Sequence, residues 1–241
     1  DWVLTPEQGE QFRDAIERQA SHAPLPYILG KIEFFGCEFR VTPAVLIPRP
    51  ETELLVELAL ERIERQPRSR VVDVGTGSGC IAVTLAMKAP GSRIWATDIS
   101  APALDVARDN AERHNVAERI TLIQADLLTP LAGRFDLIVS NPPYVSESEW
   151  PALPRSVQKE PRVALVSGPH GLDAVSMLLD QAAIRLASSG VLLMEIGENQ
   201  GDAVITLATT TFERHARRGM RFRIHRDLAS KDRILEVSLA P

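Results

Sequence analysis

One short segment consists of an expected buried strand followed by four residues that could bind a planar amino group. The strand covers residues 135–140, and Asn141, Pro142, Pro143 and Tyr144 follow it directly. The side-chain amide of Asn141 offers an oxygen acceptor, and a proline-locked turn can fix a backbone carbonyl in one direction. Two rigid acceptors can bind both hydrogens of an –NH2 group, while the Tyr144 ring stacks on the flat group that carries it. The segment predicts a site for an amide or an aromatic amine.

The nitrogen of such a group is a poor nucleophile, because its lone pair is delocalised. Acceptors that pull on both N–H bonds shift electron density toward nitrogen and favour its pyramidal form. Positioning the nitrogen against an activated methyl group could supply up to about 7–11 kcal/mol of the catalysis. Acceptors that bind best as positive charge develops add electrostatic stabilisation, and no carboxylate base is required. The alternative is that the Asn-Pro pair only ends the strand, as it does in many turns.

A second segment, VVDVGTGSGCIAVTLA (residues 71–86), combines a strand, a glycine loop and the start of a helix. The loop residues are Gly75, Thr76, Gly77, Ser78 and Gly79. Small residues let the backbone approach a ligand closely and turn sharply into a helix. The dinucleotide fingerprint G-x-G-x-x-G would place glycine at position 80, where this chain has Cys, so the spacing argues against a nicotinamide dehydrogenase.

Two further strand ends carry carboxylates. Asp98 ends an expected strand at residues 93–98, and Asp126 follows another at residues 120–125. In an open parallel sheet, ligands bind beyond the carboxyl ends of the strands, where a carboxylate can accept both hydroxyls of a ribose. Asp126 could meet the edge of an adenine. Either acid alone could instead cap a helix, but three such strand ends together predict a nucleoside cofactor.

The elements that must position these residues alternate along most of the chain. Helices are expected at residues 51–64, 80–88, 101–114, 171–187 and 198–210, and strands at 70–75, 93–98, 120–125, 135–140, 190–196, 220–225 and 233–239. Apolar strands separated by helices predict a parallel sheet that is covered on both faces. The last two strands follow each other without a helix, which allows one of them to be antiparallel. The expected fold class is α/β, a Rossmann-like doubly wound sheet of seven mostly parallel strands.

The composition limits the possible settings. The chain has 241 residues, of which 44% are hydrophobic, and no apolar run approaches the roughly 18 residues of a membrane span. Cys37 and Cys80 form neither a disulfide framework nor a metal-ligand spacing, and the five histidines are scattered. We therefore expect a cytoplasmic protein with no metal and no membrane partner. The net charge of −5 disfavours non-specific coating of nucleic acid, and the basic run at 214–226 alternates as the solvent face of a strand would.

Taken together, DVGTGSG and NPPY on a doubly wound sheet resemble the class I S-adenosylmethionine-dependent amino-group methyltransferases. The segment LIPRPETELLVE (residues 46–57) resembles more specifically the HemK/PrmC family, which methylates the side-chain amide of a glutamine in peptide chain release factors. PLPYILGKIEFFGCEF, VSNPPYV, EPRVAL and GPHGLD match as well. The resemblance runs from about residue 4 to the end of the chain.

The resemblance implies S-adenosyl-L-methionine as the cofactor and S-adenosyl-L-homocysteine as its product. Residues Gly75 to Gly79 would line the methionine part of the cofactor, Asp98 and Ile99 its ribose, and Asp126 and Leu127 its adenine. Asn141, Pro142, Pro143 and Tyr144 would hold the substrate amide, with Asn141, Pro142 and Tyr144 catalytic and Asn141 also beside the cofactor. Arg49 and Glu51 match a family-typical segment and would bind substrate at the active-site mouth. Their alternative is a surface ion pair ahead of a helix.

The family usually carries several helices before the hairpin, and only the last of them is matched here, by residues 5–20. This helix has a Thr cap and Pro in its first turn, and short extended pieces follow it, with a hairpin expected around Gly36. The predicted division is therefore 1–50, a helix and hairpin remnant of a substrate-docking domain, and 51–241, the methyltransferase domain.

The expected function is that of a monomeric enzyme whose substrate is a release factor. Three other functions are alternatives to it. A sibling group methylates a glutamine of a large-subunit ribosomal protein and shares most of these segments. An adenine methyltransferase of DNA or RNA would be expected to bring a strongly basic groove or a recognition region, so nucleic acid is not expected as the substrate. A scaffold that only binds the cofactor would not need the acceptors at residues 141–144.

Overall fold

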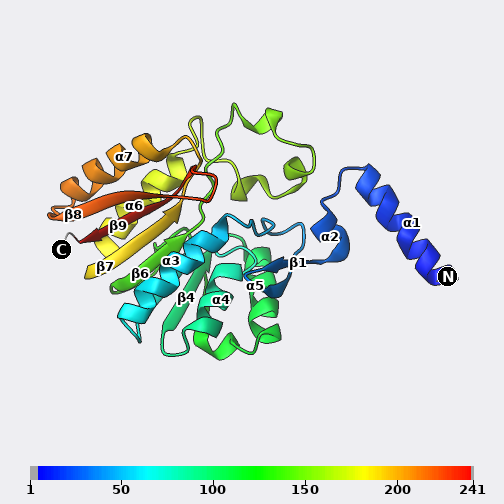
Figure 1. The fold of residues 1–241 in the computed structure, drawn as a ribbon, viewed down its shortest axis with the longest axis horizontal. Helices are drawn as coiled ribbons and strands as arrows, with labels where there is room; N and C mark the ends of the chain where they lie inside the picture. Colours follow the sequence, from blue (N-terminus) through cyan, green and yellow to red (C-terminus); the bar gives the residue numbers. More distant parts are fainter. Residues whose placement is uncertain (1–4, 240–241) are drawn as a thin grey trace.

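A seven-stranded sheet forms the centre of the computed structural model, which describes residues 5–239 (Figure 1). The strands are β3 (Arg70–Val74), β4 (Arg93–Asp98), β5 (Ile120–Gln124), β6 (Phe135–Ser140), β7 (Leu186–Glu195), β8 (Met220–Arg226) and β9 (Asp232–Leu239). Their order across the sheet is β5-β4-β3-β6-β7-β9-β8, and only β9 runs antiparallel to its neighbours. The predicted α/β class, with seven mostly parallel strands, is confirmed.

Helices cover both faces of the sheet. The helices α3 (Thr52–Arg65), α4 (Cys80–Lys88) and α5 (Ala101–Arg113) pack on one face, and α6 (Asp173–Arg185) and α7 (Gly201–Arg214) pack on the other. Successive residues of β3 alternate between the two cores, since Val71 joins the first cluster and Val72 the second. Because a central strand has no solvent face, β3 is apolar apart from Arg70 at its exposed start and Asp73. Each fully buried Val or Leu contributes about 1.5–3 kcal/mol.

The register of the sheet brings several strand ends together. The chain order reverses between β3 and β6, and Val74 pairs with Ser140, so the glycine loop and Asn141 leave the sheet side by side. Ser140 also pairs with Met194, which places Glu195 on the other side of Asn141. This reversal is the place where open α/β sheets bind ligands.

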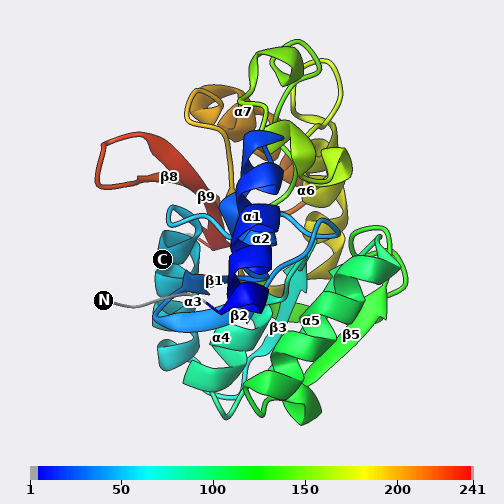
Figure 2. The ribbon, with the colours of Figure 1, turned by 90° about the vertical axis from the view of Figure 1, so that its right-hand side faces the viewer.

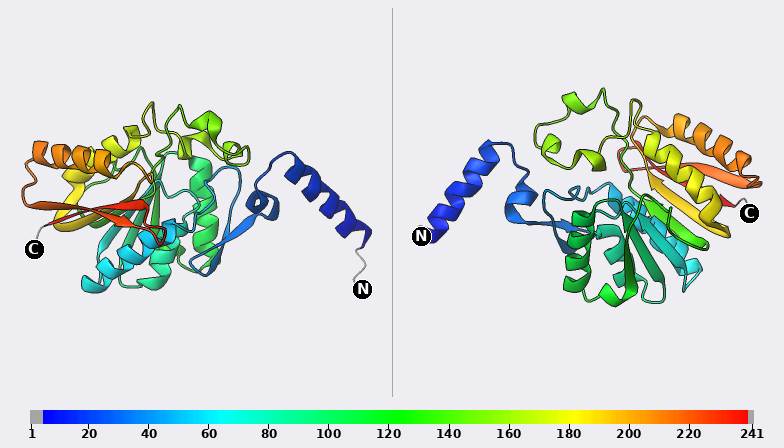
Figure 3. Two further views of the ribbon diagram at one scale, coloured as in Figure 1. Left: turned by 45° about the horizontal axis from the view of Figure 1, so that its top comes forward. Right: turned by 180° about the vertical axis from the view of Figure 1, so that it is seen from behind.

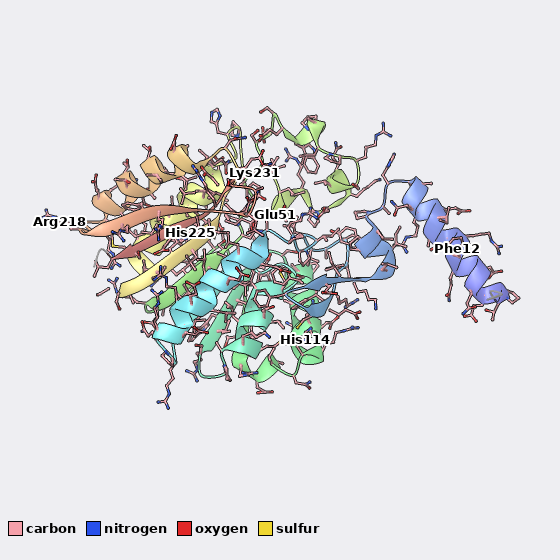
Figure 4. All side chains as sticks on the ribbon, viewed as in Figure 1. Phe12, Glu51, His114, Arg218, His225 and Lys231 are labelled. Atoms are coloured by element: carbon pink, nitrogen blue, oxygen red, sulfur yellow. The ribbon has the colours of Figure 1, made fainter. Side chains whose placement is uncertain are left out.

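The N-terminal helix α1 (Pro6–Ala20) extends away from the rest of the protein (Figure 3). Its predicted cap is confirmed, because the Thr5 hydroxyl accepts from the backbone N–H of Gln8, and the Gln8 side chain accepts from the backbone N–H of Thr5. No side chain of α1 is buried, and Phe12 is 59% exposed (Figure 4).

The connection after α1 corrects one expectation and confirms another. Residues 25–29 were expected to be extended, but they form the short helix α2 (Leu25–Leu29). Its prolines occupy the N-cap and the first turn, where no backbone N–H is needed, and Gly30 ends it in the left-handed conformation. The predicted hairpin around Gly36 is confirmed as β1 (Lys31–Phe34) and β2 (Cys37–Arg40).

The hairpin packs against the sheet domain rather than standing apart from it. Phe34 and Phe39 are buried in the same core as α3 and α4. Tyr27, Val45 and Ile47 also join a small cluster with two residues of α5. The division of the chain at residue 50 remains a prediction.

A long irregular segment follows β6. Between residues 141 and 172 the chain forms only three short helical turns, η2 (Trp150–Ala152), η3 (Val157–Lys159) and η4 (Arg162–Ala164). Figure 2 shows it at the top of the protein, beside α6 and α7. The helix expected to reach residue 187 ends at Arg185, because Leu186 already pairs with Phe135 as the first residue of β7. Within residues 5–239, no helix combines the length and apolar character needed to cross a membrane.

Candidate active site

A cavity of about 210 Å³ lies beyond the carboxyl ends of β3, β4, β5 and β6. Eight of the predicted site residues line it, namely Gly75, Gly77, Asp98, Ile99, Asp126, Leu127, Asn141 and Pro143. The remaining walls come from residues 44–46 before α3, from Ser100 and Ala103 at the start of α5, from Ala125 after β5, from Pro161, Val163 and Ala164 in the segment after β6, and from Ala174 in α6. The structure thus brings the glycine loop, both strand-end acids and the Asn141 segment to one cavity.

The glycines of the loop have two different uses. Gly75 and Gly77 have φ of +73° and +56°, and a Cβ added to either would meet no atom within 4 Å. Both line the cavity, so their missing side chains leave it open to a ligand. Gly79 faces α5 instead, where a Cβ would lie 3.0 Å from the Cβ of Ala107. The third glycine therefore permits close helix packing.

Thr76 and Ser78 do not line the cavity but hold the loop from within. Both are buried. The Thr76 hydroxyl donates to Oδ2 of Asp73 over 2.6 Å. The Ser78 carbonyl accepts a hydrogen bond of 2.8 Å from Nδ2 of Asn110, a fully buried residue of α5 that also bonds the backbone of Arg40. The loop is thus fixed to its own strand and to the hairpin.

Asp73 is a buried acid that the sequence analysis did not single out. It lies inside β3, and Oδ2 accepts from Thr76 and from the backbone N–H of Ala82. Its Oδ1 has no hydrogen-bond partner among residues 5–239. Burial raises the pKa of this carboxyl to about 7. An acid inside the apolar run VVDV was the available signal, because unpaired buried carboxylates are costly.

Asp98 is anchored by the loops on both sides of it. Its Oδ2 accepts from the backbone N–H of Gly77 over 2.8 Å, and its Oδ1 accepts from that of Ser100 over 2.9 Å. Ser100, not Asp98, caps α5, because its hydroxyl accepts from the backbone N–H of Ala103. Burial raises the pKa of Asp98. Each carboxylate oxygen keeps a lone pair that can accept from a ligand hydroxyl.

Asp126 is exposed at the edge of the cavity. No helix follows it, because Leu127 takes a left-handed conformation with φ of +52° and the chain continues as a turn. The alternative in which Asp126 caps a helix is therefore wrong. Leu127 contributes an apolar wall beside the acid.

The side-chain amide of Asn141 has a defined orientation. Its Nδ2 donates to Oγ1 of Thr52 over 3.1 Å, and Oγ1 of Thr52 in turn donates to Oε2 of Glu195 over 2.7 Å. This arrangement leaves Oδ1 of Asn141 without a donor among residues 5–239. Pro143 lines the cavity beside it, while Pro142 is buried.

Tyr144 is held at both ends and does not line the cavity. Its hydroxyl donates to Oε1 of Glu195 over 3.3 Å, and its backbone carbonyl accepts from Nε2 of Gln200 over 3.0 Å. Burial raises the pKa of the Tyr144 phenol, so it remains a donor. A Cβ on Gly171 would lie 2.1 Å from the Tyr144 carbonyl oxygen, so only glycine fits there.

Glu195 and Gln200 also contribute to the site and were not predicted from the sequence. Glu195 is 1% exposed, and burial raises its pKa to about 7. The signal was present, since Glu195 ends an apolar strand as Asp98 does. Gln200 lies in the turn before α7, where sequence spacing alone gives no sign of its contact with Tyr144.

Arg49 and Glu51 lie outside the cavity lining. Arg49 forms an ion pair of 2.5 Å with Glu160, whose other oxygen accepts from the backbone N–H of Ile47 over 3.0 Å. The Glu160 side chain is 2% exposed, so this is not a surface pair. These contacts tie Ile47 and Arg49, just before α3, to the segment after β6. Glu51 is exposed at the start of α3 (Figure 4).

Comparison with known proteins places this chain in a family. Residues 51–168 match the model of the methyltransferase small domain. The chain is 48% identical over 206 residues to a release factor glutamine methyltransferase of Moorella thermoacetica, covering 85% of this chain and 73% of that protein. It is 44% identical over 247 residues to a protein of the same name from Nitratidesulfovibrio vulgaris, covering 98% and 81%.

A solved structure agrees with these relatives. The protein-(glutamine-N5) methyltransferase (release factor-specific) of Alicyclobacillus acidocaldarius is 34% identical, with a TM-score of 0.50, over 84% of this chain and 100% of that one. The chain belongs to the family of release factor glutamine methyltransferases.

Proposed function

We propose that the protein transfers a methyl group from S-adenosyl-L-methionine to the side-chain amide nitrogen of a glutamine in a peptide chain release factor. The observation that carries this proposal is the orientation of Asn141, whose Oδ1 is left unoccupied beside the glycine-lined cavity. Relatives at 44–48% identity bear the name of this activity.

The cavity suits a nucleoside cofactor that carries an amino acid. Gly75 and Gly77 leave open space above the backbone, and Asp98 offers carboxylate lone pairs for ribose hydroxyls. Asp126, with Ile99 and Leu127, would hold the adenine between a polar edge and apolar walls. The unpartnered Oδ1 of Asp73 lies just below the loop that would hold the methionine part. S-Adenosyl-L-methionine supplies an electrophilic methyl group when bound.

The residues after β6 would prepare the substrate amide. Oδ1 of Asn141 and the backbone carbonyl of Pro142 would accept its two hydrogens, and the two prolines would fix the direction of that carbonyl. Tyr144 would stack on the amide plane. Acceptors that strengthen as the nitrogen gains positive charge lower the barrier, and their fixed positions avoid reorganisation. Pro143 and the Arg49–Glu160 pair would hold the walls around this site.

The proposal also covers the setting of the protein. We infer a monomer in the cytoplasm that acts on a protein and not on nucleic acid. Cys37 and Cys80 are both free thiols, as expected in a reducing compartment. The exposed arginines of β8 alternate with Phe222 and Ile224, which pack on the core, so they form one face of a strand rather than a groove. Light scattering would test the monomer.

The test supplies methyl-labelled S-adenosylmethionine to purified release factors, and in parallel to large-subunit ribosomal proteins and to DNA and RNA. The expected result is label on a release factor, with mass spectrometry placing a single methyl on a glutamine side-chain nitrogen. Label found on ribosomal protein or nucleic acid alone would refute the substrate assignment.

A further inference from the structure

Three side chains from separate parts of the fold form one hydrogen-bonded chain behind the amide site. Nδ2 of Asn141, at the end of β6, donates to Thr52, and Thr52 donates to Glu195, at the end of β7. Thr52 is the first residue of α3 and is 2% exposed, and Glu195 is 1% exposed. Neither is among the residues that line the cavity. Both can therefore act on a substrate only through the groups they contact.

The polarity of this chain has one consistent arrangement. An ionised carboxylate only accepts hydrogen bonds, so Glu195 obliges the Thr52 hydroxyl to donate to it. The Thr52 oxygen then has only lone pairs left, and only the NH2 end of the Asn141 amide can meet them. The opposite orientation would set Oδ1 of Asn141 against another acceptor.

We propose that Thr52 and Glu195 are positioning residues that hold the Asn141 amide with Oδ1 toward the substrate, and that Glu195 does so in its ionised form. This inference rests on the proposed function, in which Oδ1 accepts a hydrogen of the substrate amide. Oε1 of Glu195 also accepts from the Tyr144 hydroxyl. One buried carboxylate therefore holds both sides of the substrate amide site.

The surroundings of Glu195 make its ionisation sensitive to pH. The titratable or charged groups around it are Glu51 at the start of α3, Cys80 in α4, Tyr144 after β6 and Arg233 in β9. Arg233 and the two hydroxyl donors favour the carboxylate, whereas burial and Glu51 disfavour it. Burial dominates and brings the pKa of Glu195 to about 7.

Protonation would release the orientation of Asn141. A protonated Glu195 can donate to the Thr52 oxygen, which frees the Thr52 hydrogen to donate to Oδ1 of a turned amide. Because the positioning form is the ionised one, methyl transfer is expected to fall as the pH drops through about 7. The measurement uses saturating concentrations of cofactor and substrate, so that the measured rate reports kcat.

The first test compares Thr52→Val with Thr52→Ser. Valine keeps the shape of the side chain and removes the hydroxyl, while serine keeps the hydroxyl. Thr211→Val in α7 is the matched control, since Thr211 is also 2% exposed. The assay measures kcat and KM for methyl transfer to release factor, together with S-adenosylmethionine affinity by calorimetry and thermal stability.

Thr52→Val should lower kcat by at least about tenfold, as loss of one polar contact of about 1.4 kcal/mol would. Its S-adenosylmethionine affinity should stay within about twofold, and Thr52→Ser and Thr211→Val should keep kcat within about threefold, since their hydrogen bonds are preserved or uninvolved. A Thr52→Val enzyme with wild-type kcat would overturn the inference. So would a fall in kcat below pH 7 that persists unchanged in Glu195→Gln.

A second measurement needs no substrate. The side-chain amide resonances of Asn141, assigned by their loss in Asn141→Ala, should show slow hydrogen exchange in the wild type and fast exchange in Thr52→Val. Equal exchange rates in the wild type and in Thr52→Val would refute the positioning role, whether or not Thr52→Val is active. A wild type that fails to methylate release factor but shows this protection would refute the proposed function and still support the orientation of Asn141.

Discussion

The two halves of the site are built in different ways. The proposed cofactor half depends mainly on backbone N–H donors, since Asp98 accepts from the N–H of Ser100, two residues away, and from that of Gly77, 21 residues away. The amide half depends on side chains that are far apart in the sequence. Asn141 bonds Thr52, which is 89 residues away, and Tyr144 bonds Glu195, which is 51 residues away.

This difference separates binding from catalysis. Backbone amides leave little choice of orientation, so the cofactor half needs only small residues and two acids. A side-chain amide has two ends of similar shape and opposite polarity, so the amide half needs outside contacts to select one end. Substitutions in the first half should therefore change cofactor affinity, and substitutions in the second half should change kcat.

The largest effect is expected for Asn141→Ala. Removal of an acceptor that binds most strongly in the transition state should lower kcat by about 10²–10³-fold. S-Adenosylmethionine affinity should change little, since Asn141 forms only one edge of the cavity. Rapid-quench measurement of labelled release factor gives kcat, and Asn199→Ala, which removes an exposed amide, is the control. Retention of full activity would contradict the mechanism.

Asp98→Ala should weaken the cofactor half of the site. Loss of a charged acceptor of about 1.5–3 kcal/mol should raise the Kd for S-adenosylmethionine by about 10–100-fold, with a smaller change in kcat at saturation. Calorimetric titration measures this Kd. Asp105→Ala, which removes an exposed acid of α5, should bind the cofactor as the wild type does. An unchanged Kd in Asp98→Ala would remove Asp98 from the proposed ribose site.

Gln200→Ala should have a moderate effect on the amide half. Gln200 bonds the Tyr144 carbonyl over 3.0 Å and the backbone N–H of Gly197 over 2.8 Å. Loss of about 1 kcal/mol of support should lower kcat by about fivefold and leave the cofactor Kd unchanged. The same steady-state assay checks both values. A raised cofactor Kd with normal kcat would show that the two halves are not separable.

The last prediction concerns stability rather than activity, and it compares the two buried acids, one in each half. The pKa of Asp73 is raised from 3.8 to about 7, so its proton is bound more tightly in the folded state. The stabilisation this gives is complete below about pH 3.8 and is lost as the pH rises through about 7. The free energy of unfolding should fall over this window by up to about 1.4 kcal/mol per pH unit for each such group.

Urea unfolding at a series of pH values measures this slope. Asp73→Asn should reduce the slope of the unfolding free energy against pH by the contribution of one carboxyl group. Glu195→Gln should reduce it in the same way between about pH 4.5 and 7, since burial raises the pKa of Glu195 from 4.5 to about 7. An Asp73→Asn slope equal to that of the wild type would show that Asp73 is ionised throughout.

Much of the fold and of the cofactor half could be predicted from the sequence. The predicted strand ends bring the glycine loop, Asp98 and Asn141 to one edge, because parallel strands with a single reversal leave no other arrangement. The short helix α2 was missed because its prolines suggested extended chain, although they satisfy the first turn of a helix.

The supports of the amide half could not be predicted in the same way. Thr52 and Gln200 act through contacts that depend on where α3 and the turn before α7 rest on the sheet. No local spacing encodes those positions. Arg49 shows the same limit, since its partner Glu160 is 111 residues away and lies in a segment without regular secondary structure.

The bond between Glu160 and Ile47 has a consequence for how the chain assembles. The cavity wall at residues 44–46 is held by the Tyr27 hydroxyl, which donates to the Val45 carbonyl, and it leads directly into Ile47, which bonds a residue 113 positions later in the chain. During synthesis, β3, β4 and β5 can pair before Glu160 has been made, whereas the bonds from Ile47 and Arg49 to Glu160 cannot form until then. The side of the cavity formed by Pro161, Val163 and Ala164 is therefore joined to Ile47 and Arg49 only after β3, β4, β5 and β6 have all been made.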